Sequence, residues 1–241
     1  MQMHLKDMFT VDTNGWGADN SSNEFSPHFI DQDTATRYCQ ELSDQLHASG
    51  ESKCPQPQET GETPAKFILV PVQIPRDYTI IHHSPVTVKY FMESIQAWAV
   101  ETQNHVVFKM HPHNTRDYDL HKVVDDASAN SHYVHKAEGN IHELIKRSAG
   151  LFVINSGTGY EALIHGRPVC TFGDCDYRVA TFNADLRRLD EARNFLFSYK
   201  EEWRQLAYKF CYWYCTEKAY RLSDPSMKER LTNYLKGVLN A

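Results

Sequence analysis

Short apolar runs that end abruptly in polar residues recur along the chain and predict the strands of a sheet. They lie at residues 67–72, 105–108, 151–154 and 169–172. Each run is β-favouring and too short for an ordinary helix. After the third run, Tyr160, Leu163 and Ile164 recur at helical spacing, and from Asp185 onward the whole pattern is helical. This alternation predicts an α/β fold with a mostly parallel sheet flanked by helices.

The segment before the first run has a different character. Residues 8–12 predict one strand, residues 14–19 a turn-rich loop and residues 34–46 a helix. A polar, proline-containing stretch at residues 50–64 is typical of a linker. The pattern therefore divides the chain into an irregular amino-terminal extension with a linker, residues 1–64, and a sheet domain with carboxyl-terminal helices, residues 65–241.

The loop after the third run has the composition of an anion site. Ser156, Gly157, Thr158 and Gly159 stand at the predicted start of a helix. Glycine lets the backbone approach a ligand closely, and the free N–H groups and dipole of a helix N-terminus favour negative charge. Serine and threonine are also ordinary helix caps. The loop thus indicates a phosphate site or a capped helix, and it lacks the Gly-Lys-Ser/Thr of a P-loop.

Polar residues gather at the ends of the other strands as well. The run at 105–108 ends in Lys109 and His111 before Pro112, and the run at 67–72 delivers Gln73 and Asp77 into a loop. In open α/β sheets, ligands bind beyond the carboxyl ends of the strands. A cation and an imidazole that face a helix N-terminus favour a phosphate pocket. We expect these side chains to converge with the loop at 156–158.

Composition limits the class of protein. The 241 residues, 41% hydrophobic and 23% charged, can form one core with an appended segment. The net charge of −6 argues against nonspecific binding to nucleic acid. The six cysteines form no Cys-x-x-Cys pair, and no signal peptide or membrane span is visible. We expect a reduced, cytoplasmic protein, with peripheral association at the inner face of the membrane left open.

The order of these motifs resembles the capsule polysaccharide biosynthesis proteins, which are related to bacterial Kdo transferases that use CMP-activated sugar. The motifs are residues 67–73 with Asp77 and Ser84-Pro85, then Lys109-Met-His-Pro112, then residues 155–169 with Phe172-Gly173. The third reads Ser-x-x-Gly-x-Glu-Ala-Leu-x-x-Gly-x-Pro-Val from Ser156. The resemblance implies a GT-B type glycosyltransferase, with residues 65–241 as the Rossmann-like half that binds the nucleotide sugar.

The resemblance also implies roles for single residues. His111 would contact the nucleotide phosphate, Ser156 and Thr158 would hold phosphate oxygens, and Glu161 would reach the ribose. The other expected contacts to the nucleotide are Gln73, Lys109 and Gly157. Neither a metal nor a cofactor is expected, because Lys109, His111 and the helix end would stabilise the departing phosphate in place of a divalent ion. The candidates for the base that deprotonates the acceptor hydroxyl are Asp12, Asp19 and Asp77.

The partners implied are a nucleotide sugar, with a CMP-sugar favoured, and a glycan or glycolipid acceptor. A GT-B enzyme also has an acceptor half, and such halves are well over a hundred residues long. The amino-terminal extension, residues 1–64, is too short for one. We therefore expect self-association or a partner chain to complete the active site.

Two other functions stay open. One is a catalytically silent nucleotide-sugar-binding module that needs a partner. The other is a metal-dependent hydrolase, since His111 and His113 form a His-x-His pair with Asp117, His132 or His135 as further ligands. The longer histidine motifs of such hydrolases are absent from the sequence.

Overall fold

The computed structural model describes residues 4–57, 59–114 and 118–239. Its centre is a six-stranded sheet in the order β4-β3-β2-β5-β6-β7, in which every neighbouring pair is parallel. The strands of this sheet are β2 (Ile68–Pro71), β3 (Val106–Lys109), β4 (Val134–Lys136), β5 (Gly150–Val153), β6 (Val169–Thr171) and β7 (Phe182–Asn183). The predicted α/β fold with a parallel sheet is therefore confirmed.

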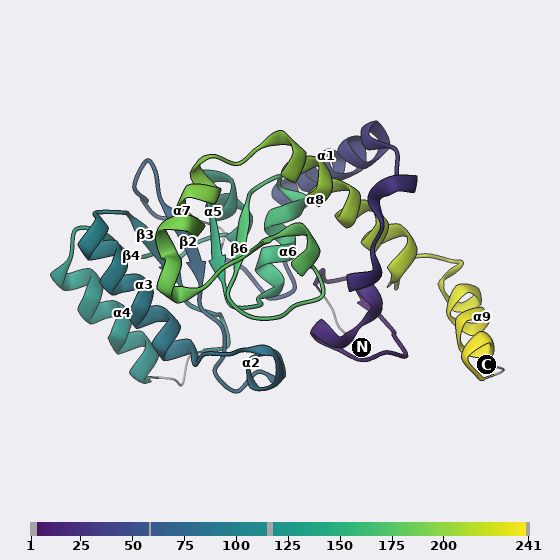
Figure 1. Cartoon of the computed structure of the whole chain (residues 1–241), viewed down its shortest axis with the longest axis horizontal. Helices are drawn as coiled ribbons and strands as arrows, with labels where there is room; N and C mark the ends of the chain where they lie inside the picture. Colours follow the sequence, from purple (N-terminus) through teal and green to yellow (C-terminus); the bar gives the residue numbers. More distant parts are fainter. Residues whose placement is uncertain (1–3, 58, 115–117, 240–241) are drawn as a thin grey trace.

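Helices cover both faces of the sheet (Figure 1). They are α1 (Gln32–Ser49), α2 (Tyr78–His83), α3 (Val88–Thr102), α4 (Tyr118–Asn130), α5 (Ile141–Arg147), α6 (Gly157–Ile164), α7 (Leu189–Phe197), α8 (Glu201–Trp213) and α9 (Met227–Leu239). Along each strand, alternate side chains point to opposite faces. Leu69 and Leu151 belong to the core formed with α1, α5, α6 and α8, whereas Val70 and Phe152 belong to the core formed with α3, α4 and α7. Burial on both faces explains why the strands read as continuous apolar runs.

Several connections differ from the sequence expectation. The loop after β2 contains a short helix, α2, for which Asp77 is the N-cap. A serine followed by proline, as at Ser84-Pro85, is typical of a helix start, but α3 begins at Val88, where the Thr87 side chain accepts a hydrogen bond from the backbone N–H of Tyr90. An N-cap supplies an acceptor for otherwise unpaired N–H groups, and here that outweighs the preference of proline for a first turn.

The amino-terminal segment packs on the rest of the molecule. Strand β1 (Met8–Thr10) pairs antiparallel with β8 (Ala219–Arg221), and Cys39 and Leu42 of α1 are buried in the same core as Phe67. The division at residues 64 and 65 stays a prediction. Helix α9, at the carboxyl end, has no buried residue and projects from the body (Figure 1). None of the helices within the described ranges is long and apolar enough to span a membrane.

Candidate functional site

The strand order places a crevice beside β2. The chain runs from β2 outward to β3 and β4, and then returns to the other side of β2 as β5. The carboxyl ends of β2 and β5 diverge at such a switch point, where ligands of open α/β sheets bind. A cavity of about 420 Å³ lies there, a size that is typical of ligand pockets.

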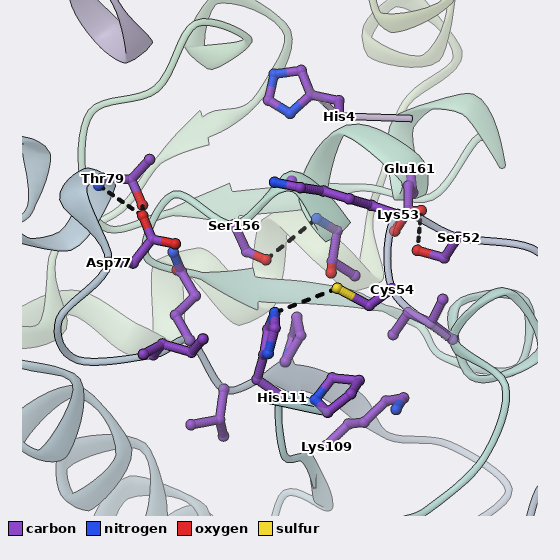
Figure 2. Close-up of a pocket in the computed structure, with 18 of the residues that line it drawn as sticks. His4, Ser52, Lys53, Cys54, Asp77, Thr79, Lys109, His111, Ser156 and Glu161 are labelled. Atoms are coloured by element: carbon purple, nitrogen blue, oxygen red, sulfur yellow. Dashed lines mark hydrogen bonds between the residues drawn. The ribbon is translucent and has the colours of Figure 1, made fainter. Parts of the chain in front are cut away.

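The cavity brings together most of the predicted site residues (Figure 2). Those that line it are Gln73, Asp77, Lys109, His111, Ser156, Gly157, Thr158 and Glu161.

Two of the candidate bases, Asp12 and Asp19, do not line the cavity. Burial acts to raise the pKa of Asp12. Hydrogen bonds from Lys218 and Ser21 have the larger combined effect and lower the pKa to about 2. Asp12 is engaged with Lys218 instead, and a role of Asp12 or Asp19 as the base stays a prediction.

The predicted anion loop forms the first turn of α6. Ser156 is the N-cap, and its Oγ accepts a hydrogen bond from the backbone N–H of Thr158 at 3.3 Å. The hydroxyl of Tyr177, which is fully buried, donates to the carbonyl oxygen of Ser156. A Cβ at Gly159 would lie 2.5 Å from that hydroxyl oxygen. Ser156 therefore caps the helix as well as lining the cavity, and glycine at 159 makes room for the tyrosine that fixes the turn.

Lys109 is a buried cation at this cavity. It is the last residue of β3, where it pairs with Pro71 of β2, and it is 7% exposed. No side-chain hydrogen bond or ion pair joins it to another residue of the described ranges. Burial lowers the pKa of Lys109, and nearby acidic groups oppose this. A buried ammonium without a partner is unfavourable, so the site suits a bound anion.

His111 presents a hydrogen-bond donor to the cavity. The backbone N–H of His113 donates to its Nδ1 at 3.1 Å, so the neutral imidazole carries its proton on Nε2. Burial, followed by the charge of His113, lowers the pKa of His111 to about 4. At neutral pH the ring is therefore uncharged. Its Nε2 lies 3.9 Å from the sulfur of Cys54.

Glu161 is the buried carboxylate of the cavity. It is 2% exposed, and Oγ of Ser52 donates to its Oε1 at 2.6 Å. Burial raises the pKa of Glu161 to about 7, although Ser52 and nearby lysines oppose the shift. This group can change its charge near neutral pH while it accepts hydrogen bonds from a ligand.

Gln73 connects two of the strand ends. Its Nε2 donates to Oδ1 of Asn155 at 2.8 Å, and its Oε1 accepts from the backbone N–H of Asn155 at 3.1 Å. Asn155 in turn donates to the carbonyl oxygen of Thr79. Gln73 thus positions the loop before α6, a role the sequence did not reveal.

Asp77 lies at the exposed side of the cavity. Its Oδ1 accepts hydrogen bonds from the backbone N–H and the hydroxyl of Thr79, both at 2.9 Å. Its charge acts to raise the pKa of His111. Of the three carboxylates considered as bases, it is the one that the fold brings to the pocket.

A histidine that the sequence analysis missed also lines the cavity. His4 is 5% exposed, and its Nε2 lies 2.8 Å from a carboxylate oxygen of Asp176. The hydroxyl of Tyr214 donates to the same carboxylate at 2.7 Å, and the His4 ring stacks on Tyr160. His4 and Asp176 are 172 positions apart. No local pattern could have joined them.

The residues considered for a metal site do not converge. His132 and His135 contact His105, which precedes β3, whereas His111 and His113 follow its other end. Six extended residues span roughly 20 Å. Asp117 lies outside the described residues. Within those residues no group of three His, Cys, Asp or Glu side chains is arranged to hold a metal ion.

Comparison with known proteins places the chain in a family. Residues 30–194 match the model of the family described as capsule polysaccharide biosynthesis protein. Protein FixF of Sinorhizobium fredii is 34% identical over 133 residues. That match covers 52% of this chain and 32% of FixF, so the chain spans about a third of the length of this relative.

Two solved structures from Thermosulfurimonas dismutans share the fold. One is described as KpsC, beta Kdo 2,7 transferase, with a TM-score of 0.53, 21% identity, and coverage of 84% of this chain and 63% of that one. The other, described as KpsC, beta Kdo 2,4 transferase, has a TM-score of 0.50, 17% identity, and coverage of 83% and 64%. At these identities the likeness concerns the fold. With the family match over residues 30–194, the chain belongs to the capsule polysaccharide biosynthesis protein family.

Proposed function

We propose that the chain binds a nucleotide sugar, with a CMP-sugar favoured, and acts as a metal-independent glycosyltransferase in surface or capsule polysaccharide synthesis. The observation that carries the proposal is Lys109, a buried ammonium without a partner among the described residues, at the same cavity as the N-terminus of α6. A phosphate between these groups would neutralise both.

The other groups of the cavity fit the rest of such a ligand. His111 would donate from Nε2 to a phosphate oxygen, and Glu161 would accept a hydrogen bond from a ribose hydroxyl. When the bond from the anomeric carbon to the phosphate oxygen breaks, Lys109, His111 and the α6 amides would stabilise the charge that develops on the phosphate. Asp77, at the exposed side, would take the proton of the acceptor hydroxyl.

The preference for cytidine comes from the family resemblance and from likeness to proteins described as Kdo transferases. The test is a thermal-shift panel of nucleoside monophosphates and nucleotide sugars, with and without EDTA. At a hundred times its dissociation constant, a ligand raises the free energy of unfolding by about 2.7 kcal/mol. The proposal predicts stabilisation by CMP or a CMP-sugar that EDTA leaves unchanged. Failure of every nucleotide to stabilise the protein would contradict it.

A further inference from the structure

The segment at residues 51–56, which the sequence analysis assigned to a linker, forms one wall of the cavity. We name it the strap. Ser52 donates to Glu161 at 2.6 Å, and the sulfur of Cys54 lies 3.9 Å from Nε2 of His111. Figure 2 shows these two contacts as dashed lines. The strap is thus tied on both sides of Lys53, to Glu161 of the third motif and to His111 of the second.

Lys53 lines the cavity although its side chain is largely exposed. In Figure 2 it reaches from the strap across the pocket. Within the described part of the chain no hydrogen bond or ion pair engages its ammonium. Besides burial, the charges of Lys53 and Lys109 each lower the pKa of His111, so both ammonium groups lie near that imidazole.

Lys53, Lys109 and the N-terminus of α6 together make the electrostatic potential in the cavity positive. Lys109 faces the cavity from the end of β3, the N-terminus of α6 contributes its partial positive charge, and Lys53 approaches from the strap. The two ammonium groups repel each other, and Glu161, whose pKa burial raises to about 7, offsets this only in part near neutral pH. An anion held between them would turn this repulsion into attraction.

We propose that Lys53 is a ligand-binding residue that completes an anion site with Lys109, His111 and the start of α6, and that the bound group is the phosphate of the nucleotide. This rests on the proposed function for the identity of the ligand. The strap supplies the cation from the solvent side of the pocket, and the hydrogen bond from Ser52 to Glu161 holds it there. Because Lys53 is exposed and unbonded, its replacement leaves the fold unchanged.

The test compares Lys53→Gln with wild type in calorimetric titrations with CMP, cytidine and inorganic pyrophosphate. Lys122→Gln, an exposed lysine of α4 outside the cavity, is the matched control. We expect Lys53→Gln to weaken CMP and pyrophosphate about tenfold or more, equivalent to 1.4 kcal/mol. Cytidine, which has no phosphate, should bind both proteins equally, and Lys122→Gln should match wild type.

The outcomes separate the two proposals. Equal affinity of wild type and Lys53→Gln for CMP would overturn the role of Lys53 and leave nucleotide binding intact. If Lys53→Gln weakened the binding of cytidine and of CMP equally, the role of Lys53 would also be overturned. The substitution would then act by changing the conformation of the strap and not by removing a contact to phosphate. If wild type binds pyrophosphate through Lys53 but no nucleotide, the anion site stands and the proposed function fails. If wild type binds none of the probes, both are overturned.

Discussion

Burial shifts the pKa of three ionisable side chains of the pocket. Lys109 is an ammonium without a partner in the described ranges, His111 is held neutral with its proton on Nε2, and Glu161 titrates near pH 7. Desolvation penalises the charged form of all three groups. A bound anion would favour the charged form of Lys109 and His111. Binding of a phosphate in the pocket would therefore change the charge states of these side chains.

His111→Ala should weaken CMP binding while the protein stays folded. Loss of a hydrogen bond to a charged group costs about 1.5–3 kcal/mol, or roughly 10- to 150-fold in affinity. Calorimetric titration with CMP measures the effect, and circular dichroism reports the fold. His28→Ala is the control, since His28 is exposed and does not line the cavity. Unaltered affinity in a folded His111→Ala protein would show that this residue does not contact the phosphate.

Glu161 should make nucleoside binding depend on pH. Above its pKa of about 7 the carboxylate is charged and accepts a stronger hydrogen bond from ribose. Cytidine affinity should therefore rise between about pH 6 and pH 8 by up to about fivefold, near 1 kcal/mol. Cytidine is the probe because phosphate itself titrates near pH 6. Glu161→Gln should flatten the profile, and a profile identical to that of wild type would assign the titration to another group.

At the scale of elements, α6 joins the site to the hydrophobic core. Its N-terminus faces the cavity, and His165 follows its carboxyl end. Oγ of Ser43 lies 2.7 Å from Nδ1 of His165, and Nε2 of His165 lies 2.9 Å from Nδ1 of His142. Nε2 of His142 donates to the carbonyl oxygen of Glu51, at the start of the strap. This chain of hydrogen bonds needs both imidazoles neutral.

The free energy of unfolding should therefore decrease as the pH is lowered. Burial, then the charge of His142, lowers the pKa of His165 to about 3, and burial lowers that of His142. Below the ordinary value near 6.5 the unfolded chain binds protons that the folded protein does not, so stability is lost as pH falls. We expect a contribution from His165 of about 1–2 kcal/mol between pH 7 and pH 5, measured by urea unfolding. His165→Gln should lose less stability over this range, and an equal loss in both proteins would contradict the account.

The sequence predicts those features of the site that are formed by residues close together in the chain, and it does not predict contacts between residues far apart in it. The strand ends at Lys109 and His111 and the turn at Ser156 are local features, and periodicity and cap chemistry predict them. Ser52 reaches Glu161 across 109 positions, and His4 reaches Asp176 across 172. Such contacts follow from tertiary packing, which no local pattern encodes. For the same reason the sequence does not reveal that Asp12, a candidate base, binds Lys218 and does not line the cavity.

At the scale of the whole molecule, the structure contains one parallel sheet of six strands within the described residues. The amino-terminal segment packs on that sheet through α1 and β1 and does not form a second such sheet there. A GT-B transferase binds its two substrates between two halves. The described residues form one such half, so we propose that a further half completes the acceptor side of the cleft.

Sugar transfer should accordingly depend on association. In a dilution series, specific activity of the purified protein should fall with concentration as the assembly dissociates, or should appear only when a partner is added. Light scattering on the same samples gives the mass in solution. Efficient turnover by a strict monomer would contradict this expectation and would place the missing catalytic groups in the amino-terminal segment, where Asp12 and Asp19 would be the first to replace.

The central claim is that the cavity beside β2 holds the phosphate of a nucleotide. A crystal structure of the protein with CMP, grown in the presence of EDTA, tests it most directly. The account predicts the phosphate between Lys109, Nε2 of His111 and the first amides of α6, with Lys53 closing over it and the ribose near Glu161. A nucleotide bound elsewhere, or a phosphate in this cavity that contacts neither Lys109 nor His111, would contradict it.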